Sequence, residues 1–211
     1  MFPLKERDTM SIEKRKEFWD VQHGKRNLKT LSGHTYSQTI PFLKIEFLIK
    51  PGVTILEVGV GTGYLTKQLH DLNCKISGLD ISEIALKKVE PYCEHIYTLD
   101  NLEKLPNAYF DLIICMYVIQ HIPNSFLEYE LECILKSLKY NTGVFAMQFA
   151  SSDKGEITPY TAREGLFCHS PEWIQSYIKR LGGTSNLMSS IKINHPLVQG
   201  VHVLHIKKKK K

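Results

Sequence analysis

The sequence lacks any hydrophobic run long enough to cross a membrane. A bilayer-spanning helix needs about 20 consecutive apolar residues, and none of the 211 residues belongs to such a run. Residues 1–15 are rich in charge and have no apolar centre of the kind that a secretory signal peptide contains. We therefore expect a cytoplasmic protein without a membrane span.

Cysteines in metal-binding arrangements are also lacking. No Cys-x-x-Cys pair and no His/Cys cluster with zinc-finger spacing occurs among the five cysteines, which are Cys74, Cys93, Cys115, Cys133 and Cys168. In a reducing compartment such cysteines remain free thiols and are mostly buried. We predict no metal site.

Outside its C-terminus, the chain has no excess of either charge. The formal net charge is +5, and the five consecutive lysines at 207–211 account for all of it. A neutral body argues against a large phosphate-binding surface, so nucleic acid is not an expected partner. We predict that residues 207–211 form a solvated, disordered tail. Contact of this tail with an anionic surface is the alternative.

The sequence does contain a regular alternation of strand and helix signals. Short apolar runs, separated by helical segments, are expected to form strands at 53–58, 75–81, 95–99, 110–116 and 144–149. This order predicts a doubly wound, mostly parallel, Rossmann-like α/β sheet of about seven strands. The last two candidate strands, 191–194 and 201–206, have no helix between them, and we expect a C-terminal antiparallel hairpin.

The segment before the first strand has a different character. Two helices are expected there, at 12–21 and 41–49, with a polar stretch between them. We predict that residues 1–50 form an N-terminal helical lid and that residues 51–206 form the core. Among the later helices, Ser82 and Ser170 are expected N-caps, and Ser125 with Glu128 has capping-box spacing.

A glycine-rich turn follows the first buried strand, in the segment Glu57-Val58-Gly59-Val60-Gly61-Thr62-Gly63. Glycine lets a ligand approach the backbone closely, and the next helix offers unpaired N–H groups. The dinucleotide fingerprint requires a small residue where Tyr64 or Thr66 stands, and the Lys-Ser/Thr of a phosphate loop is absent. A turn without a ligand remains the alternative for this motif taken alone.

An acidic residue ends the next strand, in Gly78-Leu79-Asp80. A carboxylate there can accept hydrogen bonds from both hydroxyls of a ribose. Asp80 lies 17 residues beyond Gly63, close to the spacing expected for a ribose-binding acid. It could also cap the following helix, but Ser82 is already available for that role.

These motifs, followed by Phe110-Asp111 and by His121-Ile122-Pro123, resemble the class I S-adenosylmethionine-dependent methyltransferases from about Gly52 to Phe149. The resemblance implies S-adenosylmethionine as cofactor, with S-adenosylhomocysteine as product. It places the methionine half of the cofactor at the glycine turn and its ammonium group near Glu57. In the turn itself, the resemblance implies contacts from Gly59, Gly61 and Gly63. It places Asp80 at the ribose and four residues at the adenine: Ile81, Asp100, Asn101 and Leu102. It also places the backbone of Cys115 and Met116 near the methyl group, and Trp19 and Tyr36 in the lid. Trp19 could instead anchor a helix to the sheet.

The acceptor is less well defined. There is no Asn-Pro-Pro-Tyr motif of nucleobase methylation after the fourth strand and no added recognition domain. Both facts favour a small or medium-sized acceptor, methylated on oxygen or nitrogen. His121 and His169 are the candidate general bases. The alternatives are a non-catalytic scaffold protein and a nucleotide-dependent oxidoreductase, and a monomer and a homodimer both remain open.

Overall fold

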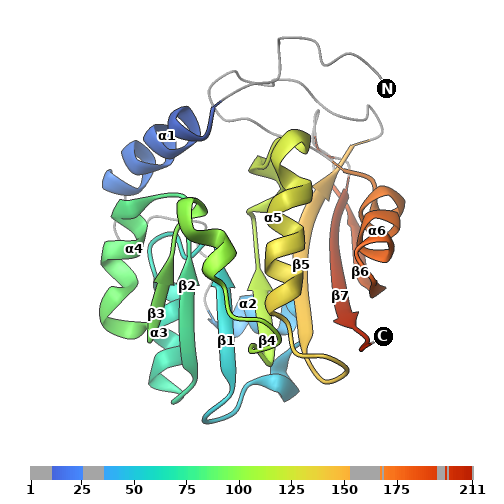
Figure 1. The fold of residues 1–211 in the computed structure, drawn as a ribbon, viewed down its shortest axis with the longest axis horizontal. Helices are drawn as coiled ribbons and strands as arrows, with labels where there is room; N and C mark the ends of the chain where they lie inside the picture. Colours follow the sequence, from blue (N-terminus) through green and yellow to red (C-terminus); the bar gives the residue numbers. More distant parts are fainter. Residues whose placement is uncertain are drawn as a thin grey trace.

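The computed structural model describes residues 11–25, 36–152, 167, 169–193, 198 and 200–210, with the backbone alone at 36–37. These residues form a seven-stranded sheet of order β3-β2-β1-β4-β5-β7-β6 (Figure 1). Its strands are β1 (Thr54–Val58), β2 (Lys75–Leu79), β3 (His95–Tyr97), β4 (Leu112–Cys115), β5 (Val144–Ser151), β6 (Gly183–Lys192) and β7 (Gly200–Lys208). The first five strands are parallel, and β7 is antiparallel to both of its neighbours. The predicted fold class and C-terminal hairpin are confirmed.

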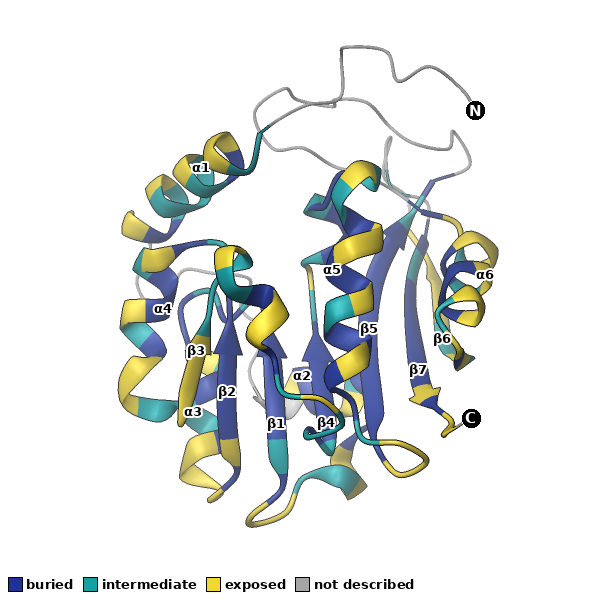
Figure 2. Cartoon of the chain, viewed as in Figure 1, coloured by how far each residue is buried: buried dark blue, intermediate teal, exposed yellow. Residues whose placement is uncertain are grey.

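Helices cover both faces of this sheet. They are α1 (Ile12–Gly24), α2 (Tyr36–Leu43), α3 (Tyr64–Asp71), α4 (Glu83–Val89), α5 (Asn124–Ser137) and α6 (Pro171–Arg180), with short 3-10 helices η1 (Glu46–Leu48), η2 (Glu90–Tyr92), η3 (Leu99–Lys104) and η4 (Ile119–His121). One apolar cluster joins the sheet to α5, α6 and η3, and a second joins its other face to α2 and α3. In β1, Leu56 contributes to the first cluster and Ile55 to the second. Successive side chains of a strand point to opposite faces. Because both faces of the sheet are covered, β1 is buried from Ile55 to Val58 (Figure 2).

Two of the predicted helix N-caps are confirmed. The hydroxyl of Ser82 accepts a hydrogen bond from the backbone N–H of Ala85, and the hydroxyl of Ser170 accepts one from that of Trp173. The expected capping box of Ser125 and Glu128 is wrong, because the N-cap of α5 lies two residues earlier than Ser125. Its N-cap is Pro123, which makes no side-chain cap, so Ser125 lies inside the first turn.

The second N-terminal helix also begins earlier than expected. It runs from Tyr36 to Leu43 with Pro41 inside it, and Lys44, at φ +56°, ends it. Ile40 and Leu43 are fully buried in the second apolar cluster. This packing, rather than local helix propensity, determines where the helix lies. Only η1 occupies the remainder of the expected helix.

The last two strands are longer than their apolar runs. β6 begins at Gly183 and is built largely from polar residues, since an edge strand leaves much of its surface in water. β7 continues to Lys208, so the prediction of a disordered tail is wrong for Lys207 and Lys208. The Lys208 ammonium donates a hydrogen bond to the carbonyl of Lys136 and lies 4.1 Å from the Tyr140 ring centre. No described helix is long and apolar enough to cross a membrane.

Candidate functional site

A cavity of about 320 Å³ lies at the carboxyl ends of β1, β2 and β4. The strand order reverses between β1 and β4, and ligands of open α/β sheets bind at such a switch point. Helix α1 lies beyond the ends of β1 and β2 (Figure 1) and contributes Arg15, Trp19 and His23 to the cavity wall. The position of this cavity agrees with the place that the sheet topology predicts for a ligand.

The glycine turn shapes one wall of the cavity. Gly59 has φ +78°, and a Cβ atom there would lie 2.1 Å from Cγ2 of Val118, so a larger residue is excluded on two grounds. Gly61, at φ +54°, would place a Cβ no closer than 3.6 Å to a neighbouring side chain, that of His23. Gly59 therefore permits close packing of the backbone, whereas a Cβ at Gly61 would make only ordinary van der Waals contact with His23.

Glu57, at the end of β1, is a carboxylic acid with only 5% of its surface exposed. The Thr66 hydroxyl donates a hydrogen bond of 2.7 Å to its Oε2 atom. Burial, together with the smaller effect of the nearby charge of Asp80, raises the pKa of Glu57 to about 8, although the Thr66 hydrogen bond opposes the shift. A group buried in this way favours a cationic partner, which would stabilise its ionised form.

Asp80 connects the glycine turn to the start of α4. Its Oδ2 atom accepts a hydrogen bond from the backbone N–H of Gly61 at 3.0 Å, and its Oδ1 atom accepts one from that of Ser82 at 2.8 Å. Burial raises the pKa of Asp80 to about 6, although the backbone N–H groups of Ser82 and Gly61 oppose the shift. Ser82 caps α4, so Asp80 is not required as the cap.

The donor set of the cavity fits S-adenosylmethionine. Glu57 and Asp80 bring two buried carboxyl groups to one small space, and the cofactor brings two cationic groups and a ribose with two hydroxyls. The cavity volume lies within the range of about 300–1,000 Å³ that is usual for small-molecule sites. Ile81 and Leu99 add apolar surface to the same wall.

The inner face of α1 forms the roof of the cavity. The Trp19 ring stacks on His23 at 5.6 Å and meets His121 edge-on at 5.0 Å. On the outer side, Asp20 Oδ1 accepts hydrogen bonds from the hydroxyl of Ser82 and the backbone N–H of Ile84. These contacts attach α1 to α4 and to the loop that contains His121.

Eight of the residues predicted from the sequence line this cavity: Trp19, Glu57, Gly59, Gly61, Asp80, Ile81, Met116 and His121. Of the others, six do not line it: Gly63, Asp100, Asn101, Leu102, Cys115 and His169. Gly63 is the N-cap of α3, and Leu102 and Cys115 belong to the core below. The Asn101 side chain accepts a hydrogen bond from the backbone N–H of Thr98. The side chain of Tyr36 lies outside the described residues.

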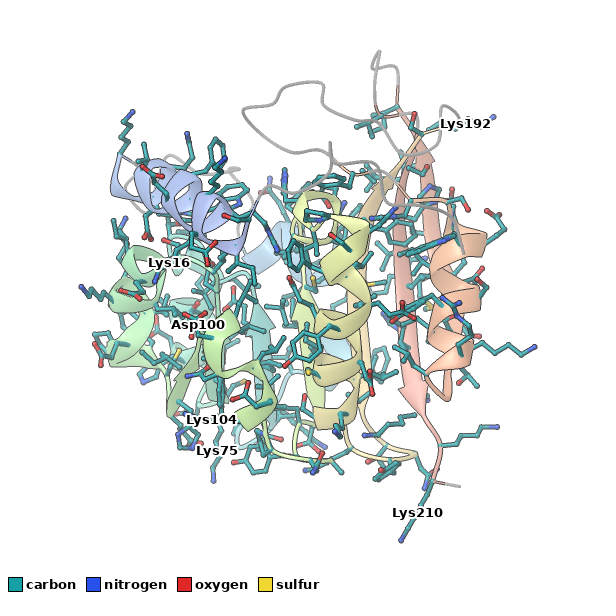
Figure 3. The ribbon with its side chains drawn as sticks, turned by 45° about the horizontal axis from the view of Figure 1, so that its top comes forward. Lys16, Lys75, Asp100, Lys104, Lys192 and Lys210 are labelled. Carbon is teal, nitrogen blue, oxygen red and sulfur yellow. The ribbon has the colours of Figure 1, made fainter. Side chains whose placement is uncertain are left out.

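Asp100 and His169 are placed away from the cavity wall. Asp100 is exposed in η3 and lies near Lys16 of α1 (Figure 3). The pKa of Lys16 is raised by its hydrogen bond to Glu83 and, further, by the charges of Asp100 and Asp20. The His169 ring stacks on Trp173 at 5.0 Å, and burial lowers its pKa to about 4. His121 is therefore the one predicted base that lines the cavity.

Polar residues of the wall that were not predicted from the sequence include Arg15, His23, Thr39 and Glu130. Arg15, Trp19 and His23 recur every four residues, which places them on one face of a helix. Arg15 and His23 are each only 5% exposed, which is unusual for such residues. The four-residue spacing of Arg15, Trp19 and His23 is the feature of the sequence from which this wall could have been predicted.

Comparison with known proteins agrees with the fold. Residues 26–190 match the model of a methyltransferase domain family. A ubiquinone biosynthesis O-methyltransferase from Azoarcus sp. is 32% identical over 136 residues, which are 61% of this chain and 58% of that protein. A similar enzyme of Paramagnetospirillum magneticum is 30% identical over 39% of this chain and 36% of its own length. The chain thus matches between about a third and about three fifths of these curated relatives.

Solved structures resemble the whole described fold. The 1,6-didemethyltoxoflavin-N1-methyltransferase of Burkholderia thailandensis, with bound 1,6-didemethyltoxoflavin and S-adenosylhomocysteine, superposes with a TM-score of 0.71 at 16% identity, covering 100% of this chain and 93% of that one. The magnesium protoporphyrin IX methyltransferase of Synechocystis, with bound S-adenosylhomocysteine, gives 0.64 at 14% identity, covering 92% and 98%. The family model spans most of the chain, and the protein belongs to the methyltransferase domain family with the class I S-adenosylmethionine-dependent methyltransferase fold.

Proposed function

We propose that this protein transfers the methyl group of S-adenosylmethionine to an oxygen atom of a small-molecule acceptor. The observation that carries the proposal is one cavity that joins Glu57, the glycine turn and Asp80 with His121. The name of the Azoarcus relative, an O-methyltransferase, supports oxygen as the acceptor atom. The neutral body of the chain favours a small molecule over a nucleic acid.

The residues of the cavity divide the binding of the donor between them. Glu57 would hold the ammonium group, and Asp80 would accept hydrogen bonds from the ribose. Ile81 and Leu99 would contact the adenine. When bound, the donor supplies a methyl group on a sulfonium, which is electrophilic without further activation. The protein then needs only to position the acceptor and to receive its proton.

His121 is the proposed acceptor of that proton. A hydroxyl becomes a competent nucleophile only as its proton leaves, and an imidazole in the cavity wall can accept it. Trp19 packs edge-on against the His121 ring and so restrains its orientation. We propose that α1 acts as a lid, because Trp19 reaches the cavity from a helix that precedes the core.

Cofactor binding is tested by calorimetry with S-adenosylhomocysteine and with NAD⁺. We expect micromolar binding of S-adenosylhomocysteine and no binding of NAD⁺. Asp80→Asn removes the charge, and its single amide oxygen can accept a hydrogen bond from only one of the two backbone N–H groups of Gly61 and Ser82. We expect about tenfold weaker binding of S-adenosylhomocysteine. Asp71→Asn is the matched control, because Asp71 is an exposed carboxylate of α3. Binding of NAD⁺ alone would instead indicate an oxidoreductase.

Catalysis is tested by release of S-adenosylhomocysteine in the presence of a panel of hydroxybenzoates and catechols. We expect His121→Gln to lower kcat by about 10²- to 10⁴-fold with little change in the affinity for S-adenosylhomocysteine. His70→Gln, at an exposed position of α3, is the control. Tight binding of the cofactor without turnover of any compound in the panel would favour the scaffold alternative.

A further inference from the structure

A buried ion pair crosses the cavity at the end nearest α5. Arg15 of α1 donates a hydrogen bond of 3.0 Å from Nη1 to Oε1 of Glu130 in α5. Both side chains are more than nine-tenths buried, and both line the cavity. The guanidinium carbon also lies 5.4 Å from the centre of the Phe126 ring, which restrains the plane of the group.

The guanidinium of Arg15 is not fully used by this pair. Its Nε atom is buried and has no hydrogen-bond partner among the residues that the structure describes. A guanidinium has five N–H donors in a fixed fork, a geometry that matches the two oxygens of a carboxylate. A buried donor without a partner is unfavourable, so the Nε–H of Arg15 favours an anionic ligand beside the guanidinium.

The position of Arg15 indicates which ligand supplies that anion. His23, at the other end of the inner face of α1, lies beside Gly61 of the glycine turn. Arg15 precedes His23 by eight residues, about 12 Å along a helix. The methionine half of the donor, which carries its carboxylate, is assigned to the glycine turn. The partner of Arg15 is therefore expected to belong to the acceptor.

The surface beside the Arg15–Glu130 pair is apolar. The wall near Glu130 is completed by Ile122 and Ile134, which offer apolar surface.

We propose that Arg15 binds a carboxylate group of the acceptor and that Glu130 orients the guanidinium for this contact. The acceptor is then a hydroxylated small molecule with an apolar body and a carboxylate. This inference rests on the proposed methyl transfer and specifies its acceptor class. The negative charge of Glu130 weakens the attraction of Arg15 for an anion, so its removal should strengthen binding.

The experiment uses benzoate as the probe and the full chain saturated with S-adenosylhomocysteine. Calorimetry compares benzoate with benzamide, which has the same ring but no charge. We expect benzoate to bind at least tenfold more tightly than benzamide, and Arg15→Gln to remove this preference. Arg15→Lys keeps the positive charge but lacks the forked donor geometry of a guanidinium, so it should retain only part of the preference for benzoate over benzamide. Glu130→Gln should bind benzoate several-fold more tightly than the unmodified chain.

Arg180→Gln is the matched control, because Arg180 is an exposed arginine of α6. Thermal unfolding of each variant shows whether it is folded, and Glu130→Gln tests the proposal even if Arg15→Gln does not fold. No preference for benzoate, or an unchanged preference in Arg15→Gln, would overturn the proposal. Weaker binding of S-adenosylhomocysteine to Arg15→Gln, with benzoate unaffected, would assign Arg15 to the donor and also overturn it. Failure of the unmodified chain to bind S-adenosylhomocysteine would instead refute the proposed function.

Discussion

Replacing Glu57 with glutamine should stabilise the ligand-free protein while weakening its affinity for the donor. The substitution keeps the shape of the side chain and an oxygen that can accept the hydrogen bond from Thr66. It removes a carboxyl group whose pKa burial raises from 4.5 to about 8. At pH 7 this carboxyl is protonated in the folded protein but ionised in the unfolded chain.

The pKa difference sets the size and the pH range of the effect. Each pH unit between the unfolded pKa and pH 7 costs about 1.4 kcal/mol of folding free energy, so the penalty at pH 7 is about 3 kcal/mol. The folded state holds the extra proton between about pH 4.5 and pH 8. Stability of the unmodified protein therefore falls as the pH rises through this window, whereas that of Glu57→Gln should fall less.

Urea denaturation of both proteins, at pH 4 and at several values up to pH 8, measures this difference. The two free energies of unfolding should be similar at pH 4 and should separate in favour of the variant as the pH rises. Calorimetry of S-adenosylhomocysteine in buffers of different ionisation enthalpy should show proton release from the unmodified protein and less from the variant. A variant that is less stable at pH 7, or an advantage independent of pH, would refute the account of Glu57.

Two further predictions concern stability. Gly59→Ala should lose at least about 3 kcal/mol of unfolding free energy, because its Cβ would overpack against Val118 and its φ angle is positive. Gly52→Ala, with φ +81° and open space around it, should lose only the part that comes from backbone strain. Equal losses of unfolding free energy for the two variants in urea denaturation would contradict this prediction. Because burial lowers the pKa of His169 to about 4, stability should fall as the pH falls from 6.5 toward 4. His169→Phe, which can still stack on Trp173, should remove much of that dependence and leave kcat at neutral pH unchanged, whereas a large loss of kcat would restore His169 as a candidate base.

The parts of the fold that follow from local chemistry could be predicted from the sequence. Buried strands such as β4 are apolar throughout, since both faces are covered, and Ser82 caps its helix by a contact three residues away. The edge strand β6 could not be predicted over its full length. Its pairing with β7 supplies the hydrogen bonds that its polar sequence does not signal. The place of Lys208 in β7 is likewise not predictable from the sequence, because its partner Lys136 lies far away along the chain.

The sequence could predict that Glu57, Gly59 and Asp80 lie together, because they follow the ends of strands and the topology of the sheet gathers those ends. The roof of the cavity could not be predicted in the same way, because α1 does not show the apolar face that is usual for a helix packed on a core. The inner face of α1 carries Arg15, Trp19 and His23 where a helix packed on a core would carry aliphatic residues. Burying a cation and an imidazole is unfavourable unless a partner or a ligand compensates for it. A helix that repeats such residues every four positions therefore indicates, already in the sequence, a surface formed for a polar ligand rather than for packing.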